Sequence, residues 1–151
     1  LAFTAEEAWQ SMPGGKSSSV HLEKFPEAVM PAQWSDSEAA RWEKLLAARG
    51  KVNEALEEQR KLKKIGKSLE AKVQIKGGGL AVEDANLLEE ICLVSGVEVL
   101  GGSGGVEVTV FPANGKKCER CWKHSESVGQ NKEHPNLCGR CAEVVLSGSS
   151  S

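Results

Sequence analysis

The chain has 151 residues, of which 40% are hydrophobic, and its 19 basic and 21 acidic side chains give a formal net charge of −2. This balance excludes a chain that is basic throughout, so any surface that binds nucleic acid must be local. The sequence contains neither an apolar run of about 18 residues, as a membrane span requires, nor a secretory signal.

A first helix is predicted over residues 1–12. Phe3, Trp9 and Met12 lie on a common side of this helix, and Pro13-Gly14 ends it. The chain begins at Leu1 rather than at a methionine. We therefore expect it to have been cut from a longer protein.

A second, longer helix is predicted from Ser35 or Asp36 to Gly66. Glu38 is placed to complete a capping box with Ser35, and glycine is the usual residue just after a helix ends. One face of this helix is formed by residues at three- and four-residue steps, namely Trp42, Leu45, Leu46, Arg49, Val52 and Leu56.

The end of this predicted helix is strongly basic. Cations at a helix C-terminus interact favourably with the helix dipole, although two or three would be enough for that. Contact with the phosphates of a nucleic acid is the other interpretation. The run has five cations and no acid: Arg60, Lys61, Lys63, Lys64 and Lys67.

The middle of the chain predicts a small α+β module. Apolar and polar residues alternate in two stretches, as in half-buried strands, and two glycine clusters separate the elements. Neither glycine cluster has the strand–loop–helix context of a phosphate-binding loop. The predicted order is a strand over 69–75, a helix over 82–95, and strands over 97–100 and 106–111.

Four of the five cysteines form two Cys-x-x-Cys pairs, Cys118/Cys121 and Cys138/Cys141, with sixteen residues between the pairs. This spacing is typical of a closed four-thiolate zinc site that builds structure and leaves no position for a substrate. Two short disulfides or a thioredoxin-like redox pair are the alternatives, and a redox pair requires a βαβ context. We expect Cys92, in an apolar helical stretch, to be a buried core residue and not a nucleophile.

The zinc segment is mildly basic. Between residues 115 and 141, six basic and three acidic side chains leave a formal charge of +3. Trp122 follows a predicted ligand and is interpreted either as a platform for an unpaired base or as the packing centre of a small module. The cations that we predict to reach phosphates here are Lys117, Arg120, Lys123 and Arg140.

Three segments resemble one family. Leu1 to Pro13 resembles a late helix of the anticodon-binding domain of class I aminoacyl-tRNA synthetases, and residues 49–71 resemble the next long helix of that domain in the isoleucyl members. Lys117 to Trp122, His134-Pro135 and Leu137 to Cys141 are similar to the C-terminal zinc module of bacterial-type isoleucyl enzymes.

The resemblance implies a monomeric parent that activates isoleucine with ATP and Mg²⁺ and transfers it to its tRNA, recognising the anticodon arm. It also implies that the catalytic and editing domains lie outside this chain, since the family's ATP-binding signatures are absent from its residues. No catalytic residue is therefore assigned. Zinc thiols suit a reducing compartment, so we expect a bacterial-type cytoplasm or an organelle of bacterial ancestry.

The expected fold class is α+β, in a fragment of several parts. We predict the end of a helical anticodon-binding domain over 1–67, a small α/β junction over 68–113, a zinc ribbon over 114–146 and a disordered tail over 147–151. Two alternatives stay open for function. One is a zinc module that binds DNA, as in formamidopyrimidine-type glycosylases, and the other is a zinc-stabilised module for protein interaction.

Overall fold

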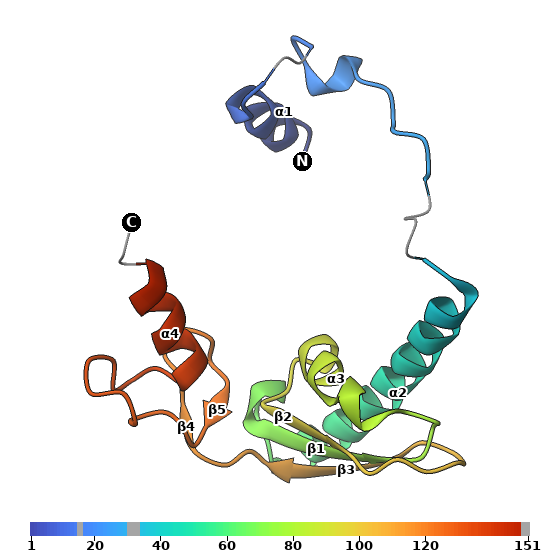
Figure 1. Cartoon of the computed structure of the whole chain (residues 1–151), viewed down its shortest axis with the longest axis vertical. Helices are drawn as coiled ribbons and strands as arrows, with labels where there is room; N and C mark the ends of the chain where they lie inside the picture. Colours follow the sequence, from blue (N-terminus) through green and yellow to red (C-terminus); the bar gives the residue numbers. More distant parts are fainter. Residues whose placement is uncertain (15–16, 30–33, 149–151) are drawn as a thin grey trace. The chain divides into compact units, whose positions relative to one another are not determined.

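The computed structural model describes residues 1–14, 17–29 and 34–148, and the chain divides into two compact units, Leu1–Trp34 and Ser35–Ser151 (Figure 1). Each unit is described by itself. Within the described ranges, no helix is both long enough and apolar enough to cross a membrane.

The first unit is built on helix α1, Ala2–Ser11, which agrees with the helix predicted over 1–12. A 3-10 turn, Val20–Leu22, is tied back to α1 by the carboxylate of Glu6. Glu6 accepts hydrogen bonds from the Ser19 hydroxyl at 2.8 Å and from the Val20 backbone at 3.0 Å.

The second unit begins with helix α2, Asp36–Lys61. Ser35 caps its N-terminus as predicted, because the Ser35 hydroxyl accepts a hydrogen bond from the Glu38 backbone at 3.3 Å. The other half of the predicted capping box does not form, since the Glu38 carboxylate pairs with Arg41 at 3.1 Å. Leu46, predicted to face inward, is instead 54% exposed, since it lies about 100° around the helix from Leu45. The buried face consists of Leu45, Ala48, Val52 and Leu56.

Helix α2 ends five residues before the predicted Gly66. Lys63 adopts the left-handed conformation that usually requires glycine, with φ of 54°. Its backbone donates to Arg60 at 2.9 Å and the backbone of Lys64 donates to Gln59 at 3.0 Å, the two bonds of a Schellman motif. The basic run therefore continues beyond the helix as a turn, and Ile65 in this turn is buried in the core.

A three-stranded sheet follows, in the order β2-β1-β3. Strand β1 (Ala71–Lys76) pairs in parallel with β2 (Gly96–Val99) and antiparallel with β3 (Glu107–Pro112). Val73 lies opposite Val97 on one side and Val110 on the other. All three predicted strands are thus confirmed within about two residues at each end.

Helices α2 and α3 (Ala85–Cys92) cover the same face of this sheet (Figure 1). The helix predicted over 82–95 is shorter than expected: a 3-10 turn, Val82–Asp84, precedes it and Leu93 ends it in a left-handed conformation. Cys92 is buried at its end, as predicted, and burial raises the pKa of its thiol to about 11. The remaining elements are β4 (Lys116–Lys117), β5 (His124–Ser125) and α4 (Gly139–Gly148).

The two glycine clusters pack against each other. The Gly77 backbone donates to Gly101 at 2.8 Å, and a Cβ atom at Gly77, whose φ is 83°, would lie 2.3 Å from the Gly105 carbonyl oxygen. Glycine is required there by the close approach of two backbones, and this gives the clusters a structural role.

The fold is α+β, as predicted. Helix α2 shares one hydrophobic core with the sheet, although the sequence grouped it with the helical part that precedes the sheet. The boundaries proposed at residues 67 and 113 stay predictions. Ser147 and Gly148 of the predicted tail belong to α4, and residues 149–151 lie outside the described residues.

Candidate metal centre and the basic surface beside it

The first cysteine pair lies in the turn of a small hairpin. Strands β4 and β5 pair through Lys117 and His124, and the turn between them carries Cys118 and Cys121. The Cys118 backbone donates to the Lys123 carbonyl at 2.9 Å, and the Trp122 backbone donates to the Cys118 carbonyl at 2.9 Å. These bonds close the turn so that both sulfurs face the same side.

The second pair lies at the start of helix α4. The Ala142 backbone donates to the Cys138 carbonyl at 2.9 Å, which places Cys138 at the helix N-terminus and Cys141 in the first turn. The N-terminal end of a helix has a positive potential, which favours negatively charged sulfur.

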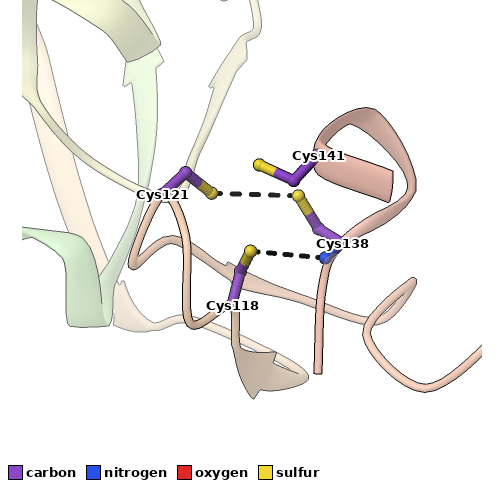
Figure 2. Close-up of side chains that lie close together, drawn as sticks. All are labelled: Cys118, Cys121, Cys138 and Cys141. Atoms are coloured by element: carbon purple, nitrogen blue, oxygen red, sulfur yellow. Dashed lines mark hydrogen bonds between the residues drawn. The ribbon is translucent and has the colours of Figure 1, made fainter. Parts of the chain in front are cut away.

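The four sulfur atoms converge on one point (Figure 2). All lie within 4.8 Å of one another, and the sulfurs of Cys121 and Cys138 are 3.8 Å apart. Four sulfurs at about 2.3 Å from a zinc ion form a tetrahedron with edges of about 3.8 Å, whereas a disulfide bond is only about 2.05 Å long. All four cysteines are free thiols. Their arrangement fits a structural zinc ion, and it excludes two short disulfides in this structure.

Charge around the sulfurs also favours a cation. Burial opposes ionisation of Cys118, but backbone N–H groups, among them that of Cys138 at 3.3 Å, outweigh it and lower the pKa of this thiol to about 6. Burial likewise opposes ionisation of Cys141, and the Arg120 guanidinium at 3.7 Å helps to lower its pKa. Burial raises the pKa of Cys138 to about 12 and that of Cys121 above its usual value. Binding of a divalent ion would favour the thiolate form of these two cysteines as well.

Three cations predicted to reach phosphates are engaged within the protein. Arg120 points its guanidinium at Cys141, and a hydrogen bond to the same sulfur raises the pKa of Arg140. Lys123 forms an ion pair with Glu89 of α3 at 2.6 Å. The sequence pattern does not show these partners, because they depend on the tertiary fold.

The predicted cations of the 60–67 run lie together. Arg60 binds the carboxylate of Glu57 and donates to the Ser68 hydroxyl at 2.5 Å. Lys61 is exposed on the last turn of α2. A hollow of about 470 Å³ is lined by Arg60, Lys63, Lys64, Ile65, Gly66 and Glu70.

Trp122 lies beside the end of this run. It is 58% exposed, so it is not the packing centre of the zinc module, and the Lys117 ammonium lies 5.2 Å from the centroid of its ring. A small hollow of about 60 Å³ brings these two side chains together with Lys67, Leu69, Glu70 and His124. The fold thus joins two sets of residues that the sequence marked separately.

The two hollows meet at Glu70, which lines both. Hydrogen bonds from the backbones of Gly66, at 2.7 Å, and Lys67, at 3.3 Å, lower the pKa of this carboxyl and hold it against the turn. The side chains around it are predominantly cationic. We call this surface the basic strip: Arg60, Lys63, Lys64, Lys67, Lys117 and Trp122.

Two families of known proteins match parts of this chain. Residues 1–75 match the family described as the anticodon-binding domain of tRNA ligase, and residues 115–144 match the zinc finger found in FPG and IleRS.

Similar curated proteins are isoleucine–tRNA ligases of *Geobacter sulfurreducens*, 41% identical over 96% of this chain, and *Methylacidiphilum infernorum*, 44% identical over 96%. That of *Exiguobacterium sibiricum* is 40% identical over 97%. The chain spans only 16–17% of the length of these relatives. It belongs to the isoleucine–tRNA ligase family and corresponds to part of its anticodon-binding domain and to its zinc finger.

Proposed function

We propose that this chain is a tRNA-binding part of an isoleucine–tRNA ligase. The complete enzyme would use ATP and Mg²⁺ to activate isoleucine and join it to its tRNA, with chemistry in a catalytic domain outside these residues. The basic strip carries the proposal, because it combines cations from the turn after α2 with an exposed tryptophan of the zinc module.

Each part of the basic strip suits one component of RNA. Lys63, Lys64 and Lys67 offer exposed ammonium groups to successive phosphates, with Lys61 next to them. Trp122 offers an exposed ring on which an unpaired base can stack. Unpaired bases are found in RNA loops, which supports the anticodon arm as the part of tRNA bound here.

The remaining predicted contacts take a second role in this proposal. Arg120 and Arg140 balance the charge of the thiolates, and Lys123 is paired with Glu89. The N–H groups that these three side chains do not use within the protein could still reach RNA, but the side chains cannot move away from their present partners to do so. Direct contact is therefore assigned first to Lys61, Lys63, Lys64, Lys67, Lys117 and Trp122.

Zinc would be held by Cys118, Cys121, Cys138 and Cys141, and its role would be structural. Four thiolates complete its coordination shell, so the ion has no position for water or substrate. It fixes the hairpin that carries Lys117 and Trp122 against the start of α4. Reduced thiols suit the cytoplasm of a bacterium, and one copy of the chain supplies all four ligands and the entire strip.

DNA binding is the second candidate, because the zinc-finger family that matches residues 115–144 is also found in FPG proteins. Titration of the zinc-loaded chain with isoleucine tRNA and with duplex DNA, each at two salt concentrations, separates the two functions. We expect tighter binding to the tRNA, with an affinity that falls as salt rises. Equal affinity for both nucleic acids, or a preference for the duplex, would contradict the proposal.

A further inference from the structure

The zinc module (residues 116–148) joins the sheet through a narrow polar contact. Each side has its own hydrophobic cluster, and among the described residues the two clusters share no member. Apolar burial therefore does not determine how the zinc module is oriented on the sheet. Within the described part of the chain, two hydrogen-bonded side-chain contacts link the zinc module to the sheet and to α3, and we call them the seam: Ser95 with Leu69 and His124, and Glu89 with Lys123.

Ser95 links three segments of the chain. Its hydroxyl donates to the Leu69 carbonyl at 2.5 Å and accepts a hydrogen bond from the His124 backbone of strand β5 at 2.8 Å. Its own backbone donates to the Ala71 carbonyl at 3.0 Å, so the residue is fixed at the start of the sheet. One hydroxyl thus uses its proton on the sheet side and a lone pair on the zinc hairpin.

Glu89 provides the second contact. Its carboxylate lies 2.6 Å from the ammonium of Lys123, and the two side chains are only 27% and 23% exposed. Ion pairs on an open surface contribute little, but partial burial reduces the screening of this pair. Lys123 lies two residues after the ligand Cys121, so the contact reaches the metal-binding turn directly.

The seam is flanked by open space. A pocket of about 360 Å³ lies against Glu89, Lys123 and Arg140, and a second of about 380 Å³ against Lys72, Gly96 and Asn114. Ser95 and His124 line both pockets. Little packing therefore supports the zinc module on either side of the two polar contacts.

We propose that Ser95 and Glu89 are positioning residues, which set the orientation of the zinc module so that Lys117 and Trp122 lie beside Lys67. The hollow shared by these three residues adjoins the seam, because His124 lines it as well. The expected effect on tRNA binding rests on the proposed function. The expected effect on the orientation of the zinc module does not.

The orientation is tested in the zinc-loaded chain with Ser95→Ala and Glu89→Gln combined. Residual dipolar couplings of backbone amides give the alignment of the sheet and of the zinc module separately. We expect both modules to stay folded with one zinc ion, but no longer to share one alignment. Couplings that still fit the original fixed orientation would overturn the proposal. The matched control is Ser103→Ala with Glu107→Gln, two exposed positions away from the seam.

Binding of isoleucine tRNA is measured on the same variants. We expect the seam variant to bind about fivefold more weakly, the size of effect produced by losing one hydrogen bond. Ser95→Thr with Glu89 retained keeps the hydroxyl and should bind as the unsubstituted chain does.

Unchanged tRNA affinity in the seam variant would overturn the positioning role. If the unsubstituted chain does not bind tRNA, the proposed function fails, while the dipolar couplings still decide the orientation.

Discussion

The sheet and the zinc module reach a stable fold by different physical means. Thirteen buried residues, from Leu45 to Val99, form one core between two helices and three strands. Among its described residues, the zinc module buries three cysteines and Ala142, with Val128, Leu137 and Cys121 packed partly against the cysteines. About 33 residues cannot bury enough apolar surface to fold alone, so a metal substitutes for a core. A substitution should therefore be able to remove the metal without unfolding the sheet, and another to destabilise the sheet without removing the metal.

The largest expected effect is loss of the zinc module alone. Cys138→Ser removes one of the four proposed ligands, and metal binding supplies about 10–16 kcal/mol in small zinc modules. We expect the variant to lose its zinc and the dispersed amide signals of residues 116–148, while the signals of the sheet persist. One zinc ion per chain and an intact C-terminal spectrum would contradict the prediction. A chelator added to the unsubstituted chain should have the same effect.

The converse change is made in the sheet core. Leu56→Ala removes a side chain that is only 1% exposed, and we expect the free energy of unfolding of the sheet to fall by about 2–5 kcal/mol. Zinc content at low denaturant should stay at one ion per chain. Urea denaturation followed by amide signals of β1 measures the effect. Leu46→Ala, at an exposed position of the same helix, should change the stability by less than about 0.5 kcal/mol.

A smaller effect is expected on the proposed binding of tRNA. Lys61, Lys63 and Lys64 all replaced by alanine should weaken tRNA binding about tenfold and flatten the dependence of log affinity on log salt by about 2. Replacing Lys44, Lys51 and Lys76, exposed lysines elsewhere on the same unit, serves as the control. An unaltered salt slope would show that the run only completes the end of α2.

The smallest effect concerns Glu70, between the two regions. Hydrogen bonds from the Gly66 and Lys67 backbones lower its pKa below 4.5, so its stabilising effect is complete above about pH 4.5 and is lost as the pH falls through the lowered pKa. Glu70→Gln keeps an acceptor without the charge. Its stability should therefore fall less below pH 4.5 than that of the unsubstituted chain. Urea denaturation at pH 7 and pH 3.5 measures this, with Glu58→Gln as the control; identical pH profiles for all three chains would contradict it.

Local patterns were sufficient to predict the strands and the clustering of the four cysteines. Alternation at Ala71, Val73 and Ile75 depends only on neighbouring residues, and so does the spacing within each Cys-x-x-Cys pair. The end of α2 was predicted wrongly. Lys63 supplies the left-handed residue there, and burial of Ile65 in the core compensates for a conformation that propensity alone disfavours.

The seam could not be predicted, because its partners are far apart in sequence. Glu89 and Lys123 are separated by 34 residues, and Ser95 and His124 by 29. Neither Ser95 nor Glu89 belongs to a motif, and each is an ordinary polar residue near the end of a helix. The ion pair of Lys123 with Glu89 could not be predicted for the same reason, because in the sequence Lys123 is only a cation near a cysteine.

At Trp122, the stability of the fold and the proposed binding of tRNA favour different side chains. Its backbone has φ of 66°, a conformation that costs a non-glycine residue about 1–2 kcal/mol, and its large ring remains mostly in water. Glycine at this position would relieve the backbone and remove the apolar surface that the ring exposes to water. Selection for higher thermal stability would therefore favour Trp122→Gly, and the aromatic ring would be lost. Selection for thermal stability alone and selection for the proposed tRNA binding would therefore favour different residues at this position.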